Sequence, residues 1–158
     1  MKKLNNIQSK YPNLFEKTTS ISCGDGWYWL IDNLCEQISS HIEHLNYPMK
    51  RFGVVEEPEN KKSVTITYIK EKFGVLDVFC NGADDTIWHY ISFACHLSTK
   101  ICEECGSTKY MGRTSGWIKH LCMDCGEKNR NPWTPNDDVM KEIRKDKLIK
   151  IQESENNN

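Results

Sequence analysis

Two pairs of cysteines constrain this chain more than any other feature of its sequence. The pairs are Cys102 with Cys105 and Cys122 with Cys125, and sixteen residues separate them. Each two-residue gap lets both sulfurs of a pair approach one ion, and two pairs complete the tetrahedron of a structural zinc site. A glycine follows each pair and leaves the backbone free to turn its amides toward the sulfurs. The spacing predicts a zinc ribbon over residues 101–130, with zinc as the cofactor.

Disulfide bonds and a redox-active cysteine pair are the alternatives for these residues. Eight cysteines among 158 residues are fewer than a small disulfide scaffold carries. The first residues are polar rather than apolar, and no apolar run approaches the ~20 residues that cross a bilayer. We therefore expect a cytoplasmic protein without a membrane segment, and a reducing compartment favours metal ligands over disulfides. Because four thiolates fill the metal shell, His120 is expected to be a bystander.

The residues before the cysteine pairs predict an α+β core with an antiparallel, hairpin-based sheet packed by two helices. Apolar residues recur at helical spacing from Trp27 to about Asn46. The runs Ser63–Lys70 and Val75–Cys80 are rich in β-branched and apolar residues, as in strands, and a turn containing glycine joins them into a hairpin. Asp84 or Asp85 can cap a second helix. A zinc ribbon and a charged C-terminal helix complete the predicted fold.

Finer expectations concern the segments around these elements. Residues 1–20 are mostly polar and predict a partly ordered arm, and residues 50–62 predict a loop. Alternation in the first strand places Val64, Ile66 and Tyr68 on one face.

The chain is therefore divided into three parts. Residues 1–100 form the core with its polar N-terminal arm, residues 101–130 the zinc ribbon, and residues 131–158 a linker with a charged helix and tail. Val139, Ile143 and Leu148 give this last helix a narrow apolar stripe.

The ribbon also carries candidate contacts to a partner. They mix cations with an aromatic ring, a combination that can hold phosphates and stack bases. The residues are Lys109, Arg113, Trp117, Lys119 and Lys128. From Ile101 to Arg130, however, five Lys or Arg stand against four Asp or Glu, and the net charge of the chain is −1. Such a balance does not make a basic patch, so nucleic-acid binding is an alternative to the leading hypothesis of a protein partner.

A second candidate site is the turn that includes Cys23, Asp25 and Trp27. Its glycines permit positive φ, and Asp25 can accept a hydrogen bond from the helix that follows. A Cys23 thiolate at a helix start could act as the nucleophile of a small enzyme. That role needs an oriented histidine, and every histidine is distant in the sequence. The commoner alternative packs Cys23 under Trp27.

The remaining cysteines and histidines have simpler interpretations. Cys35 and Cys95 lie on the apolar faces of helices, and Cys80 ends an apolar strand, so all three are expected to be buried and inert. His41 and His44 lack the spacing of a catalytic zinc helix and are expected at the surface.

Several segments together resemble a group of small uncharacterised proteins encoded in bacteriophages, prophages and bacteria. They are Cys-Gly-Asp-Gly-Trp-Tyr at 23–28, Lys-Glu-Lys-Phe-Gly at 70–74, Cys-Glu-Glu-Cys-Gly at 102–106, Gly-Trp-Ile at 116–118 and Leu-Cys at 121–122. The likeness spans roughly residues 11–127. It implies a zinc-bearing end and a mobile-element origin, with no established activity. This sequence departs from the group at Asp77, where a basic residue is usual, and at Cys95, where glutamate is common.

These features predict a small zinc-binding accessory protein that is non-catalytic and binds a macromolecule. If the phage-like origin holds, its target is a host or defence component. The two alternatives are a nucleic-acid-binding ribbon and a small enzyme.

Overall fold

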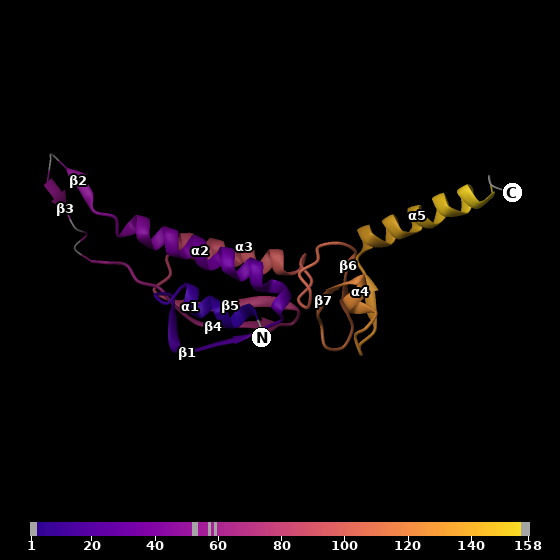
Figure 1. Cartoon of the computed structure of the whole chain (residues 1–158), viewed down its shortest axis with the longest axis horizontal. Coiled ribbons are helices and arrows are strands. Elements are labelled where there is room, and N and C mark those ends of the chain that lie inside the picture. Colours follow the sequence, from indigo (N-terminus) through magenta and orange to yellow (C-terminus); the bar gives the residue numbers. More distant parts are fainter. Residues whose placement is uncertain (1–2, 52–53, 57, 59, 156–158) are drawn as a thin grey trace.

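The computed structural model describes residues 3–51, 54–56, 58 and 60–155 and has the α+β fold that the sequence predicts. The chain is elongated: β2 and β3 lie at one end of its long axis and α5 at the other (Figure 1). The elements in chain order, with η for a 3-10 helix, are η1 (Lys3–Asn6), α1 (Ile7–Lys10), β1 (Phe15–Ser22), η2 (Asp25–Trp27), α2 (Tyr28–Leu45), β2 (Met49–Arg51), β3 (Val54–Glu56), β4 (Thr65–Lys72), β5 (Val75–Asn81), α3 (Asp85–Ser98), β6 (Met111–Thr114), β7 (His120–Cys122), α4 (Met123–Gly126), β8 (Trp133–Pro135) and α5 (Asp137–Glu155).

The central sheet has the order β1-β4-β5. β4 and β5 form the predicted antiparallel hairpin, and β1 runs parallel to β4. Phe73 and Gly74 make the hairpin turn, with φ of 53° and 80°. Two positive φ angles in a two-residue turn match the right-handed twist of the strands on either side.

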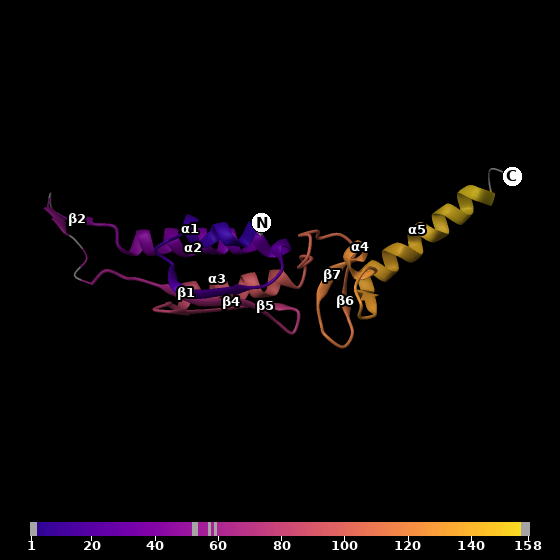
Figure 2. The same cartoon turned by 60° about the horizontal axis from the view of Figure 1, so that its bottom comes forward.

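Helices cover one face of this sheet, and Figure 2 shows them above the strands. Apolar residues at helical spacing on α2, among them Ile31 and Ile38, are fully buried and pack against inward residues of the sheet. Asp84 begins α3 as its N-cap, because its Oδ1 accepts a hydrogen bond from the Ile87 amide at 3.0 Å. The predicted second helix and its cap are confirmed.

The interpretation of residues 1–20 as a partly ordered arm is wrong for the described part, which begins at Lys3. This segment forms η1, α1 and most of β1, and it contributes Leu4, Ile7 and Leu14 to the buried core. The hydroxyl of Tyr11 donates to the backbone carbonyl of Asp32 at 3.1 Å, which ties the segment to α2. Leu4, Ile7 and Leu14 lie three and seven residues apart, a helix-like spacing that the polar composition of the segment obscured.

Two further expectations need correction. Residues 50–62 are not all loop, because β2 and β3 pair in an antiparallel hairpin. In β4, the pairing with β5 shifts between Ile66 and Tyr68, and this bulge turns Ile69 into the core, where it is fully buried. Tyr68 instead stacks on Phe79 with ring centroids 5.8 Å apart.

The second three-stranded sheet has the order β7-β6-β8 and belongs to the ribbon. Its small core contains Met111 and Leu121 beside two of the cysteines, and Trp133 packs against it. The Trp133 indole donates from Nε1 to the Leu121 carbonyl at 3.1 Å. The segment expected to be a linker therefore supplies the strand β8. Beyond it, α5 starts with Val139 buried, whereas Leu148 is 61% exposed.

Candidate metal centre

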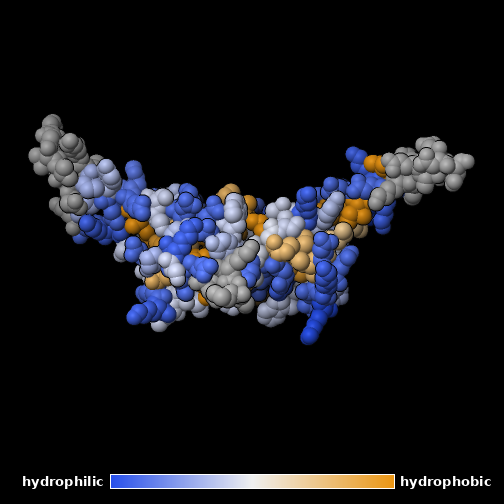
Figure 3. Space-filling view, in the orientation of Figure 1, coloured by the Kyte–Doolittle hydropathy of each residue, from blue (hydrophilic) through white to orange (hydrophobic). Residues whose placement is uncertain are grey.

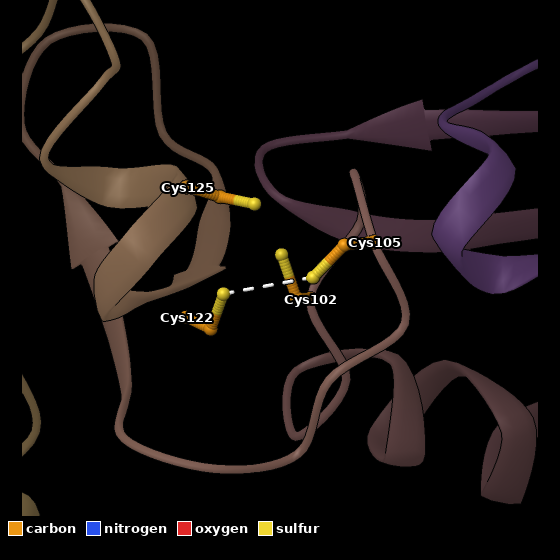
Figure 4. A group of neighbouring side chains, drawn as sticks. All are labelled: Cys102, Cys105, Cys122 and Cys125. Carbon is orange, nitrogen blue, oxygen red and sulfur yellow. Dashed lines mark hydrogen bonds between the residues drawn. The ribbon is translucent and has the colours of Figure 1, made fainter.

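Four cysteine side chains converge between β6, β7 and α4. Cys102 and Cys105 lie in the loop after α3, Cys122 ends β7 and Cys125 lies in α4, and their sulfurs point toward a common centre (Figure 4). All four sulfurs lie within 4.8 Å of one another. The Sγ atoms of Cys105 and Cys122 are 3.6 Å apart, far beyond the ~2.05 Å of a disulfide bond. The predicted pairs therefore form one group of four thiol ligands.

Local hydrogen bonds fold the first cysteine pair into a tight loop. The Gly106 amide donates to the Cys102 carbonyl, and the Cys102 amide donates to the Ser107 carbonyl, both at 2.8 Å. Gly106 has a φ of +79°, a conformation that a side chain would strain. This reversal brings the Cys105 sulfur back beside that of Cys102, as the two-residue gap predicts.

The protonation of the four thiols explains why the group suits a metal cation. Burial opposes ionisation of Cys105, but the Ser107 amide and the neighbouring thiols outweigh it and lower the pKa of Cys105. Burial raises the pKa of Cys122 and Cys125. Crowded sulfurs cannot all carry negative charge unless a cation neutralises them. A soft divalent ion with a preference for four sulfurs fits this donor set.

The turn at Cys23–Trp27 docks directly on the first cysteine pair. The Gly26 amide donates to the Glu103 carbonyl at 2.8 Å, and the Gly24 amide donates to Glu103 Oε1 at 3.0 Å. A Cβ atom on Gly26 would clash with the Cys102 carbonyl oxygen, so only glycine allows this approach. The fully buried Trp27 donates from Nε1 to the Ile101 carbonyl at 3.0 Å. These contacts give the turn a structural role that joins the core to the ribbon.

The hairpin turn of the central sheet makes a second contact with the ribbon. His120 Nδ1 lies 2.9 Å from the Gly74 carbonyl oxygen, and the His120 carbonyl accepts from the Glu103 amide at 3.2 Å. His120 is not part of the four-ligand group, and it connects β7 to the β4–β5 turn instead. The three motifs at 23–28, 70–74 and 102–106 therefore meet in one place, the junction between core and ribbon.

Glu103 is the important residue that sequence reasoning missed. Its carboxylate is buried, and burial raises its pKa, although Lys119 and the Gly24 amide act in the opposite direction. Lys119 Nζ lies 3.4 Å from Glu103 Oε2 and 2.7 Å from Glu104 Oε1. Burial lowers the pKa of Lys119, but these two carboxylates outweigh it and raise the pKa overall. The only signal for Glu103 in the sequence is that it lies with Glu104 between the two cysteines of the first pair.

The other candidate contact residues of the ribbon lie at the surface. Lys109, Arg113 and Lys128 are exposed, and Trp117 is 67% exposed, so it does not cover the cysteines. Arg113 lines a depression of about 450 Å³ that also contains Asp137 and Asp138.

Asp25 does not cap the helix that follows, which is a correction to the sequence interpretation. No side-chain hydrogen bond caps η2 or α2, and Asp25 Oδ1 is buried without a hydrogen-bond partner among the described residues. Cys23 packs against the core as a half-buried side chain.

The remaining cysteines and histidines also have defined places. Burial raises the pKa of Cys35 to about 12 and that of Cys80 to about 11, and both pack in the core. Cys95 is half-buried rather than buried. His41 Nε2 lies 2.8 Å from Asp84 Oδ2, and His44 is exposed. Burial with a raised pKa favours the neutral thiol, and the inert role of these cysteines stays a prediction.

Taken together, the fold and the site describe an α+β core joined to a ribbon that carries a four-cysteine metal group. The chain matches no family model, no curated protein and no solved structure. Within the part of the chain that the structure describes, no helix combines the length and the apolar character needed to cross a membrane.

Proposed function

We propose that this is a zinc-binding accessory protein that is not an enzyme, in which one zinc ion holds the ribbon rigid for recognition of a protein partner. The observation that carries the proposal is the convergence of four cysteine sulfurs within 4.8 Å. Four protein ligands complete the tetrahedral shell of zinc, so no position is left for water or substrate. Zinc supplies folding free energy and charge neutralisation at such a site.

The geometry of the Cys23–Trp27 turn favours this role over an enzymatic one. Its two glycine amides and the Trp27 indole are engaged by carbonyl and carboxylate groups of Ile101 and Glu103. These hydrogen bonds occupy the turn in connecting the core to the ribbon.

A protein partner is favoured over nucleic acid because of the charges on the ribbon. Lys119, one of the predicted phosphate contacts, is paired with Glu104 and Glu103. Zinc with four thiolates adds a further net charge of about −2. Affinity for nucleic acid needs several unopposed cations, and the ion pairs of Lys119 remove it from that set.

The resemblance to phage and prophage proteins extends the proposal to a biological setting. In that setting the partner is a host or defence component, and the protein acts by binding it. The visible face of the molecule is mostly hydrophilic, with apolar residues in small separate patches (Figure 3).

Metal analysis of the purified protein tests the proposal. Inductively coupled plasma mass spectrometry is expected to find one zinc per chain in the wild type, and to find it lost in Cys102→Ser. Cys95→Ser is the matched control, because Cys95 lies outside the four-ligand group, and it should keep its zinc. A wild-type protein without stoichiometric metal, or with the four thiols oxidised in pairs, would contradict the proposal.

A further inference from the structure

An apolar groove of about 230 Å³ lies open between α2 and α3. Its walls are mostly apolar and include Trp29 and Leu34 from α2 and Phe93 and Leu97 from α3. Trp29 and Phe93 are each 65% exposed, so water reaches most of both rings. An apolar groove with exposed aromatic rings is typical of a surface that receives the apolar face of another helix.

The helix α5 carries apolar side chains that are also exposed. It extends from the ribbon in the direction away from the core (Figure 1). Val139 in its first turn is buried, but further along the helix Leu148 is 61% exposed and Ile149 is 43% exposed. Most of the stability of a helix in a protein comes from the packing of an apolar face rather than from helix propensity. The far part of α5 therefore has an apolar surface available for packing.

The side of α2 that borders the groove is acidic. Neither α2 nor α3 contains a lysine or an arginine. Glu36 and Glu43 are exposed and lie seven and fourteen residues after Trp29, so they share its face of the helix. Asp32 is paired with Lys10 at 2.7 Å, whereas Glu36 and Glu43 form no ion pair with any residue that the structure describes.

The side of α5 that presents Leu148 is basic. Three exposed cations, Lys141, Arg144 and Lys145, precede Leu148 by seven, four and three residues and therefore share its face. The acidic residues Glu142 and Asp146 precede Leu148 by six and two residues, which places them on the other side of the helix. An apolar residue among cations on α5 is thus the complement of an apolar groove beside carboxylates on α2.

These two complementary surfaces belong to one chain but do not meet within it. The groove lies on the core, and α5 leaves the far side of the ribbon and points away from the core (Figure 1). Two copies of the chain can join the surfaces, because α5 of each copy then has the groove of the other before it. Such a contact between unlike surfaces closes into a dimer when it is made in both directions.

We infer that the chain associates with a second copy of itself, with α5 of one copy lying in the groove between α2 and α3 of the other. Leu148 and Ile149 fill the groove between Trp29 and Phe93, and the cations of α5 face Glu36 and Glu43. The inference goes beyond the proposed function, because it concerns association of the chain with itself and assigns a role to α5.

Sedimentation velocity of the zinc-loaded full chain tests the inference. The wild type is expected to pass from monomer to dimer as its concentration rises, and to dissociate as salt screens the charges. Trp29→Ala and Leu148→Asp are each expected to raise the dissociation constant about tenfold or more. Glu36→Lys should raise it about two- to fivefold. Trp117→Ala is the matched control, because Trp117 is 67% exposed and lies outside the groove, and it should associate like the wild type.

A mixture of two variants identifies which surfaces meet. Trp29→Ala keeps an intact α5, and Leu148→Asp keeps an intact groove. Each alone should stay monomeric where the wild type is dimeric, whereas an equimolar mixture should associate through the one contact that remains. Circular dichroism of each variant establishes that the fold is retained, and all three substituted side chains are mostly exposed or, for Glu36, at the surface of α2.

Three results would overturn the inference. A wild type that is monomeric at its highest soluble concentration shows that the groove receives no second copy. Undiminished association of Leu148→Asp shows that two grooves pair with each other and that α5 takes no part. A mixture that associates no more strongly than its two components shows that the groove and α5 are not the surfaces that meet.

Discussion

The core and the ribbon of this chain are stabilised in different ways. The core buries a large apolar cluster drawn from two helices, three strands and the N-terminal segment. The apolar cluster of the ribbon consists of Met111 and Leu121 beside Cys102 and Cys122, with Cys125 and Trp133 packed against it. Burial of apolar area stabilises folds by about 25 cal/mol per Å², so the core has a sufficient source of stability and the ribbon does not. The difference indicates that the ribbon depends on its metal.

The contacts that join the core to the ribbon differ in kind from the contacts that stabilise each region. Their junction rests on hydrogen bonds from glycine backbones to Glu103 and on the contact between Gly74 and His120, rather than on a broad apolar interface. We therefore expect a change in the ribbon to disturb the turn at Gly24 and Gly26. The apolar core should keep its fold.

Removal of the metal should have the largest effect and should act on the ribbon and on the turn docked against it, not on the apolar core. Structural zinc contributes about 10–16 kcal/mol of apparent binding free energy to small zinc domains at pH 7. A chelator is expected to abolish amide protection in β6 and β7 while α2 and β4 keep theirs, which hydrogen exchange with mass spectrometry measures. Loss of protection in both regions together would show that core and ribbon form one cooperative unit.

A cavity in the core should destabilise the core and leave the ribbon and its zinc unchanged. Ile38 is fully buried in α2, and Ile38→Ala is expected to lower the free energy of unfolding of the core by about 2–5 kcal/mol. Zinc content should stay unchanged. Leu45→Ala is the matched control on the same helix, because Leu45 is 40% exposed and its loss costs far less. Denaturant unfolding followed by circular dichroism measures both variants, and release of zinc from Ile38→Ala before the core unfolds would argue against separate stabilities.

A clash at the junction should have an intermediate effect on both regions. In Gly26→Ala the new Cβ clashes with the Cys102 carbonyl oxygen, and relief of such crowding costs about 1–3 kcal/mol. The Gly26 amide should lose its exchange protection because its bond to Glu103 lengthens. Gly116→Ala is the comparison variant: Gly116 has a φ of +75°, but the nearest atom to its Cβ is 3.6 Å away and belongs to Asn131. It should strain the ribbon and leave the protection of Gly26 intact; unchanged protection in Gly26→Ala would contradict the proposed junction.

Loss of the α3 cap should have the smallest effect and should be confined to the core. Asp84→Ala removes the acceptor for the Ile87 amide and is expected to cost about 0.5–2 kcal/mol, whereas Asp84→Asn keeps an acceptor and costs less. The hydrogen bonds from His41 and from that amide lower the pKa of Asp84 in the folded state. Its contribution is therefore complete above the unfolded pKa of ~3.9 and declines as the pH falls through the lower folded value. Thermal melts from pH 6 to pH 2 should show this decline in the wild type and a flatter curve in Asp84→Asn; identical curves would refute the assignment.

The sequence by itself determined the elements whose signals are local. The two-residue gaps of the cysteine pairs predicted the four-ligand group, helical periodicity predicted α2, and Asp84 predicted the start of α3. Each of these signals lies within a few residues, because ligand spacing, helical periodicity and capping act over one or two turns of chain.

Only the tertiary structure decided how these elements meet. The bond between Gly24 and Glu103 spans 79 positions of the sequence, and no short-range pattern encodes such a pairing. The same holds for the bulge that turns Ile69 inward. Burial is a property of the folded chain as a whole, so the junction became visible only when segments distant in sequence were packed together.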